Sequence, residues 1–425
     1  MADRDPAASG DAGRLGTSGS RRRSGMRAPA PAAGGRLLLR PAAVHDGDRR
    51  HERVDVEIDT ASGRLVGLQP RAAASQAAGG TALGAAVHEL PGLVIAPALV
   101  DIQVNGGGGV MLNDQPSLEG LEKIVTAHRR CGVGQVMPTL ISASPETAAQ
   151  AAEAAVAAAR DQLPGFAGLH LEGPHLAADK AGVHDRRLLR PMGDEDLRFY
   201  CRLRERLGEL PLVVTVAPEV VEPAGVRALA AAGVIVSLGH SATGAEAAVA
   251  AIDAGATLVT HLFNAMSGLR AREPGLVGVT LTDPRVHAGM ILDREHVAWH
   301  SARTAVAALG ERLHLVSDAL SCVGGGPQQF RFGASDVQVV NGVCQTDGML
   351  AGGALPLTDM LTNTVAWLGL GLDEAVPLAT TSPARALGLP AAGRLRPGGH
   401  ADLIALSASG ETRAIMMGGA WLEHS

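Results

Sequence analysis

Residues that can bind a metal ion or transfer a proton follow four short apolar runs in the middle of this chain. The runs and the residues they lead to are Gly165–Leu169 with Glu172, Val234–Gly239 with His240, Thr257–Thr260 with His261, and His314–Ser317 with Asp318. A buried carboxylate at such a place is costly unless it is paired, hydrated or bound to a metal. Because the carboxyl ends of parallel strands converge on one mouth of an α/β barrel, we expect these four side chains to share one site.

Helix-forming segments separate the apolar runs, as in an alternating α/β fold. The segments Ala148–Arg160, Val226–Ala232 and Ala245–Ala254 are rich in Ala, the strongest helix former. Gly233 and Gly255 directly follow the last two, where glycine commonly ends a helix. This alternation predicts a parallel sheet, and its length favours a (β/α)8 TIM-type barrel over an open sheet.

Short β-type runs also occur near both ends of the chain. They are Arg36–Arg40, Val54–Ile58 and Arg64–Leu68 on one side, and Ala401–Leu406 and Thr412–Met417 on the other. We therefore predict that residues 36–96 and 389–425 form one small β-sandwich domain beside a barrel at 97–388. We also predict a hairpin insertion in the barrel at Gln328–Asp347, turning at Asn341–Gly342.

Composition excludes several classes of protein. The net charge of −6 and the 2% aromatic content argue against a nucleic-acid-binding surface. Residues 1–35 lack the apolar core of a signal peptide and are expected to be a disordered tail, in which Met26 is an alternative start. No apolar stretch is long enough to span a membrane. The cysteines Cys131, Cys201, Cys322 and Cys344 are scattered, which predicts free thiols in a cytoplasmic protein.

The residue types at the strand ends match a catalytic metal centre. Glu172, His240 and His261 can supply one carboxylate and two imidazoles, leaving an open position on the ion for water. Zn²⁺ suits this donor set, although Fe²⁺, Mn²⁺ or Co²⁺ could occupy it as well. Asp318 could take a proton from that water and later deliver it to a leaving group. Each residue alone is a weak signal, and their joint placement carries the hypothesis.

An ordered series of motifs from about residue 97 to 388 resembles the N-acetylglucosamine-6-phosphate deacetylases of the amidohydrolase superfamily. The matching segments are Pro97–Gly106, His170–Pro174, Val216–Glu219, Gly239–Thr243, Thr260–Met266, Arg272–Leu276, Ser317–Ala319 and Ser382–Ala386. The resemblance implies that Glu172, His240 and His261 bind one divalent metal per subunit, and that Asp318 is the general acid/base. Gln103 and Asn105 stand where many amidohydrolases carry a His-x-His pair, so the chain is similar to the single-metal branch.

The same resemblance implies an amino sugar phosphate as substrate and a homodimer as assembly. It places His184 near the acetamide carbonyl, Asn264 and Ala265 on the sugar or phosphate, and Arg272 and His296 on the 6-phosphate. In the family, part of the phosphate site can come from a neighbouring subunit. A planar guanidinium such as that of Arg272 suits phosphate because it donates two parallel hydrogen bonds.

Three readings of function remain open at this point. The first is hydrolysis of the acetamide of N-acetylglucosamine 6-phosphate to glucosamine 6-phosphate and acetate. The second is another amidohydrolase activity, either on the epimeric N-acetylgalactosamine 6-phosphate or on a cyclic amide, although Arg272 and Ser382–Arg385 favour a phosphosugar over a pyrimidine ring. The third is a non-catalytic scaffold, which would be expected to have lost some of the ligands, yet all are present.

Overall fold

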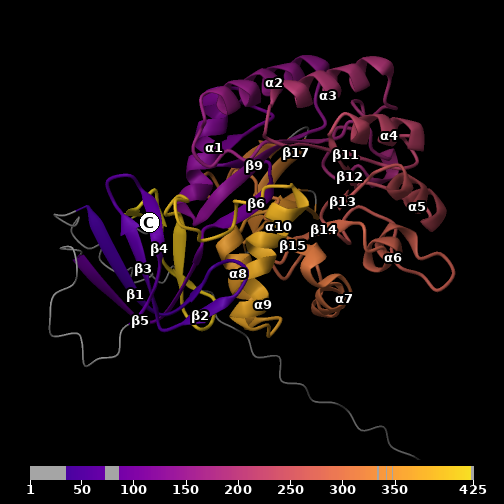
Figure 1. Ribbon diagram of the computed structural model, residues 1–425. Helices are drawn as coiled ribbons and strands as arrows, with labels where there is room; N and C mark the ends of the chain where they lie inside the picture. The colour runs from indigo at the N-terminus through magenta and orange to yellow at the C-terminus, as the bar shows by residue number, and fades with distance from the viewer. Residues whose placement is uncertain (1–34, 72–85, 333–334, 341, 347, 423–425) are drawn as a thin grey trace, which may run out of the picture.

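The computed structural model describes residues 35–71, 86–332, 335–340, 342–346 and 348–422. The expected tail therefore lies outside the described residues except for Gly35. Strands from both ends of the chain build one sheet, and the middle of the chain builds a parallel barrel with helices around it (Figure 1). In that figure, yellow C-terminal strands lie beside the indigo N-terminal strands.

The terminal sheet has eight strands and its own hydrophobic core. Its order is β22 (Ala420–Leu422), β21 (Thr412–Met417), β20 (Leu403–Leu406), β5 (Ala86–Pro97), β1 (Arg36–His45), β3 (Val54–Asp59) and β4 (Arg64–Pro70), with β2 (Arg50–Glu52) paired to β1. The sheet confirms the predicted joining of the two chain ends. β5 joins them: it pairs with β1 on one side and with β20 on the other, and then runs directly into the first barrel strand.

The barrel contains eight parallel strands in sequence order. They are β6 (Leu99–Val104), β9 (Val133–Ile141), β10 (Leu169–Glu172), β11 (Leu212–Val216), β12 (Ile235–Leu238), β13 (Leu258–Val259), β14 (His287–Met290) and β15 (Leu313–Leu315). A parallel bridge between Val104 and Ala319 brings the end of β6 beside the segment after β15 and so nearly closes the barrel. The (β/α)8 prediction is confirmed.

Helices cover the outside of the barrel (Figure 1). They are α1 (Leu118–Arg130), α2 (Pro145–Arg160), α3 (Asp194–Arg206), α4 (Pro223–Ala231), α5 (Ala245–Asp253), α6 (Gly275–Thr282), α7 (Trp299–Leu309), α8 (Leu357–Ala366), α9 (Leu372–Ala379) and α10 (Thr381–Ala386). α2 begins at a serine cap and buries its Ala-rich face, as its composition predicts. Within the described residues, none of these helices is both long and apolar enough to cross a membrane.

The expected strand at Gly165–Leu169 is misplaced in the sequence prediction. The strand is β10, and only Leu169 of the predicted run belongs to it. Gly165 and Gly168 have φ of 86° and 115°, a left-handed backbone that cannot continue a strand. Glu172 is therefore the last residue of the strand rather than a residue beyond it.

A four-stranded antiparallel insertion follows β15 and reaches the barrel mouth. It comprises β16 (Gln329–Phe332), β17 (Ser335–Val340), β18 (Val343–Thr346) and β19 (Met349–Gly353), which confirms an antiparallel insertion here and extends it beyond the predicted end. Asn341 of the predicted turn lies outside the described residues. The four cysteines are free thiols, and the buried Sγ atoms of Cys322 and Cys344 lie 3.5 Å apart.

Candidate functional site

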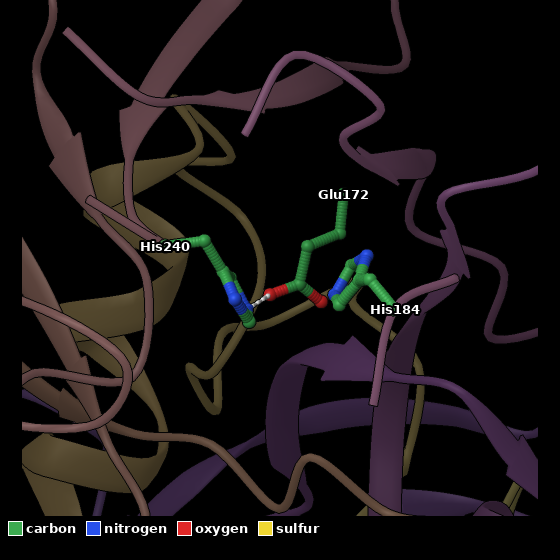
Figure 2. A group of neighbouring side chains, drawn as sticks. All are labelled: Glu172, His184 and His240. Carbon is green, nitrogen blue, oxygen red and sulfur yellow. Dashed lines mark hydrogen bonds and ion pairs between the residues drawn. The ribbon is translucent and has the colours of Figure 1, made fainter. Parts of the chain in front are cut away.

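Glu172, His240 and His261 meet at the carboxyl end of the barrel. Oε1 of Glu172 lies 3.1 Å from Nε2 of His240 and 3.0 Å from Nε2 of His261. The two Nε2 atoms are themselves 3.0 Å apart, so the three donor atoms form a nearly equilateral triangle. Figure 2 shows Glu172 and His240 directed toward one another, with His184 on the other side of the carboxylate. All of these side chains are buried.

Three residues of the site have a left-handed backbone conformation, which turns their side chains toward the mouth of the barrel. The φ angles of His240, His261 and Asp318 are 46°, 31° and 48°, although none of these residues is glycine. Such conformations cost of order 1–3 kcal/mol each and cluster at functional sites. Each occurs just after a barrel strand, where the chain must leave the barrel wall.

The hydrogen bond at the far side of His240 fixes the state of its ring. Nδ1 of His240 lies 2.7 Å from the backbone carbonyl of Lys180, which can only accept, so Nδ1 carries the proton. In the neutral ring, Nε2 then presents a lone pair to the Glu172 carboxylate. Nε2 of His240 and Oε1 of Glu172 would then be two acceptors facing one another, and a cation bound between them would remove their repulsion. Histidines that bind a metal commonly donate their other ring N–H to a backbone carbonyl, as His240 does.

The spacing of the triangle also fits a metal ion. Tetrahedral coordination with bonds of about 2.0–2.1 Å separates ligand atoms by roughly 3.3 Å. The observed separations of 3.0–3.1 Å are close to that value. Glu172, His240 and His261 could therefore hold one divalent ion.

His184 lies against the same carboxylate and offers a second possible ligand set with Glu172 and His240. Its Nδ1, however, accepts the backbone N–H of Ser142 at 3.3 Å and contacts the Ser142 hydroxyl at 2.8 Å. Since Nδ1 accepts, the proton of the neutral ring is on Nε2, which is then a donor rather than a ligand. Burial lowers the pKa of His184 to about 3, which keeps the ring neutral. We therefore favour His261 as the third ligand.

Asp318 lies across from the triangle and is held by two amides from β6 and its end. Its Oδ1 accepts from Nδ2 of Asn105 at 2.7 Å and from Nε2 of Gln103 at 3.2 Å. Burial, and then the negative charge of Glu172, raise the pKa of Asp318 to about 6. A carboxyl group with this pKa can both accept and release a proton near neutral pH.

The charge of Glu172 is fixed by its neighbours. Burial acts to raise its pKa, but its contacts with the His240 and His261 rings outweigh burial and hold the pKa well below the usual range. For His261, burial lowers the pKa, and the hydrogen bond and charge of Glu172 more than offset it, so the pKa is raised. The site therefore keeps an ionised carboxylate where a cation would be bound.

A pocket of about 290 Å³ opens over these groups. Among its lining residues are the predicted site residues Glu172, His184, His240, His261, Asn264, Ala265, His296 and Asp318. Nδ1 of His296 is bound to Asp293 at 2.6 Å. Arg272 is exposed and is not part of the pocket wall of its own chain.

Several residues that line the pocket were not predicted from the sequence. Lys180, Phe332 and Leu350 line it, together with Asn105, whose amide contact to Asp318 had no recognisable motif. Phe332 and Leu350 belong to the antiparallel insertion, and the hairpin pattern predicts the insertion but not which end of the barrel it covers. Lys180 precedes the Gly182–His184 segment by two residues, and only the fold brings its carbonyl to His240.

Comparison with known proteins places the chain in a family. Residues 94–422 match the model of the Amidohydrolase family. N-acetylgalactosamine-6-phosphate deacetylase of Shewanella sp. (strain ANA-3) is 38% identical over 335 residues, which cover 78% of this chain and 84% of that protein. N-acetylglucosamine-6-phosphate deacetylase of Haemophilus influenzae is 31% identical over 341 residues, covering 79% and 88%.

A solved structure agrees with these sequence matches. The N-acetyl-D-glucosamine-6-phosphate deacetylase of Mycobacterium smegmatis, solved as a mutant in complex with N-acetyl-D-glucosamine-6-phosphate, superposes with a TM-score of 0.81 at 33% identity. The alignment covers 91% of this chain and 99% of that one. This chain therefore belongs to the amidohydrolase family and is a metal-dependent hydrolase by descent.

Proposed function

We propose that this protein hydrolyses the acetamide of N-acetyl-D-glucosamine 6-phosphate to D-glucosamine 6-phosphate and acetate. The observation that carries the proposal is the donor triangle of Glu172, His240 and His261 beside a proton-transferring carboxyl, Asp318, in one pocket. The resemblance to deacetylases of acetamido sugar phosphates over most of the chain supports the choice of substrate.

The residues of the pocket divide the reaction between them. Asp318 takes a proton from the attacking water as the new C–O bond forms at the acetamide carbonyl. It then delivers that proton to the nitrogen as the C–N bond breaks, which leaves a free amine and acetate. Nε2–H of His184 donates a hydrogen bond to the carbonyl oxygen, where negative charge develops.

A divalent ion held by Glu172, His240 and His261 would lower the pKa of water and polarise the carbonyl. We propose one such ion per subunit and Zn²⁺ as its identity, since one carboxylate and two imidazoles suit that ion. The set leaves a position open, as catalytic sites require. The four free cysteines support a reducing, cytoplasmic location.

The 6-phosphate is proposed to meet His296 in the pocket and Arg272 from a neighbouring chain, while Asn264 and Ala265 contact the sugar or phosphate. Arg272 lies outside its own pocket, on an exposed loop that also presents Leu269 with 59% of its surface accessible. An exposed leucine near a guanidinium that has no ion pair among the described residues supports a homodimer in which Arg272 reaches the partner's phosphate site. Replacement of Arg272 with Ala is expected chiefly to raise KM for the phosphorylated sugar.

One assay tests the proposed substrate against its alternatives. Purified protein of measured metal content is supplied with the 6-phosphates of N-acetylglucosamine and N-acetylgalactosamine, and with unphosphorylated N-acetylglucosamine. We expect acetate release with the highest kcat/KM on the first. A higher kcat/KM on the galactosamine epimer would transfer the assignment to it, the activity of the Shewanella relative. No acetate from either phosphate would refute the proposal.

A further inference from the structure

The first barrel strand, β6, and the residue that follows it carry two side-chain amides that contact the carboxylates of the site. Gln103 and Asn105 are two residues apart, so both point to the inside of the barrel. Both are buried, with 2% of their surface exposed. In the mechanism above neither amide touches the reacting atoms, which leaves their conformation and contacts unexplained.

Gln103 lies between the two carboxylates of the site. Its Nε2 is 3.2 Å from Oδ1 of Asp318, and it is 3.3 Å from Oε2 and 3.5 Å from Oε1 of Glu172, so Oε2 is the nearer oxygen of that carboxylate. An amide nitrogen has two hydrogens, so it can donate one to each carboxylate. The other oxygen, Oε1, lies farther from Gln103 and contacts both His240 and His261.

Asn105 completes the contact with Asp318. Its Nδ2 donates to Oδ1 at 2.7 Å, so this oxygen receives hydrogen bonds from both amides. The opposite orientation of the Asn105 amide would place its oxygen against the carboxylate, which is repulsive. Oδ2 of Asp318 has no hydrogen bond within the described residues and is the oxygen left for the substrate.

The backbone fixes the same alignment. The Asp318 N–H donates to the Gln103 carbonyl at 3.0 Å, and the Asn105 N–H donates to the Ala319 carbonyl at 2.9 Å. On its other side, the Asp318 carbonyl accepts from the Gly353 N–H of the insertion at 2.8 Å. Side chain and main chain of Asp318 are therefore both held against the end of β6.

We infer that Gln103 and Asn105 are positioning residues that assign one oxygen of each carboxylate to its task. Gln103 lies nearer to Oε2 of Glu172 and so turns Oε1 toward the metal position. Gln103 and Asn105 together hold Oδ1 of Asp318, which leaves Oδ2 for proton transfer. This inference rests on the proposed function. It assigns to the two amides the positioning of the carboxylates rather than the binding of a metal.

Two alanine variants separate these tasks by metal affinity. Gln103→Ala is expected to weaken divalent-metal binding by about 10–100-fold, the range typical of groups that orient a ligand. Asn105→Ala is expected to bind metal as wild type does, because Asn105 touches no ligand, and to lose about 10–100-fold in kcat with little change in KM. Zn²⁺ affinity is measured by chelator competition, which needs no turnover.

A third variant separates positioning from packing. Asn105→Asp keeps the shape of the side chain but places a like charge or a shared proton against Oδ1 of Asp318. Positioning predicts that Asn105→Asp has a lower kcat than wild type, and a lower one than Asn105→Ala where both fold. A packing role predicts that Asp restores activity, and that result would overturn the inference.

The metal measurement is independent of the substrate. Equal Zn²⁺ affinities in Gln103→Ala and wild-type protein would remove the assigned role of Gln103. Absence of acetate release by the wild-type enzyme would instead refute the proposed function, and the chelator result would still decide whether Gln103 orients Glu172.

Discussion

Replacing Asp318 with Asn is expected to lower activity and raise stability in the same protein. The asparagine keeps the shape of the side chain, and its oxygen can still accept from Gln103 and Asn105. Its nitrogen then occupies the place of Oδ2 and cannot take a proton. A positioned general acid/base contributes about 10²–10⁴-fold, so kcat should fall by that factor, equivalent to roughly 3–5 kcal/mol of barrier.

The stability gain follows from the pKa of Asp318. Burial and the charge of Glu172 raise this pKa from 3.8 to about 6 in the folded protein. The folded state thus binds the proton more tightly, so stability is highest at low pH and falls as the pH rises from about 4 to 6. Above pH 6 the ionised carboxylate costs at most about 3 kcal/mol, since the residue is only partly buried and lines the pocket. The Asp318→Asn substitution removes that cost.

Urea unfolding of chelator-treated protein measures the gain, and metal-reconstituted enzyme measures kcat. The excess stability of Asp318→Asn over wild type should grow between pH 4 and pH 6 and stay constant above. Asp101→Asn is the matched control. Burial also raises the pKa of Asp101, to about 7, but its carboxyl lies below the site, where it accepts from the backbone N–H groups of Gln103 and Ser317. Near-wild-type turnover of Asp318→Asn with normal metal content would refute the assigned role. A stability difference that does not change with pH would refute the electrostatic reasoning.

Three further results are expected. Glu172→Ala should lose both bound metal and turnover, which elemental analysis and acetate release will show, because it removes one of three donor atoms. Elemental analysis of dialysed wild-type protein should find about one tightly bound divalent ion per chain, and a value near two would contradict the single-metal reading. His128→Gln should lose less stability on acidification than wild type. Burial lowers the pKa of His128 to about 4, so between pH 6.5 and 4 the wild type loses about 3 kcal/mol that the variant keeps, as urea unfolding at the two pH values will test.

Local sequence patterns predicted the barrel and the meeting of Glu172, His240 and His261 because both depend on short-range signals. An apolar run, a turn and a polar residue define a strand end, and the alternation with Ala-rich helices gives the strand order. The triangle needs only that successive strand ends converge, which any parallel barrel supplies. The boundary error at Gly165–Leu169 is of another kind. There the apolar residues are buried as the pattern predicts, but the left-handed φ of Gly165 and Gly168 makes the strand begin only at Leu169.

The amide contacts could not be predicted in this way, because barrel closure creates them. Gln103 lies in the first strand of the barrel and Asp318 follows the last strand, 215 residues later, and these two segments meet only when the sheet closes. In the sequence, Gln103 and Asn105 indicate only that the His-x-His pair of many amidohydrolases is missing. In the structure, the same substitution supplies N–H donors where imidazoles would have supplied ligands. Since a carboxylate beside Glu172 needs donors to remain ionised without a second cation, the two amides would let the proposed single-metal site keep Asp318 in its proposed role as the base.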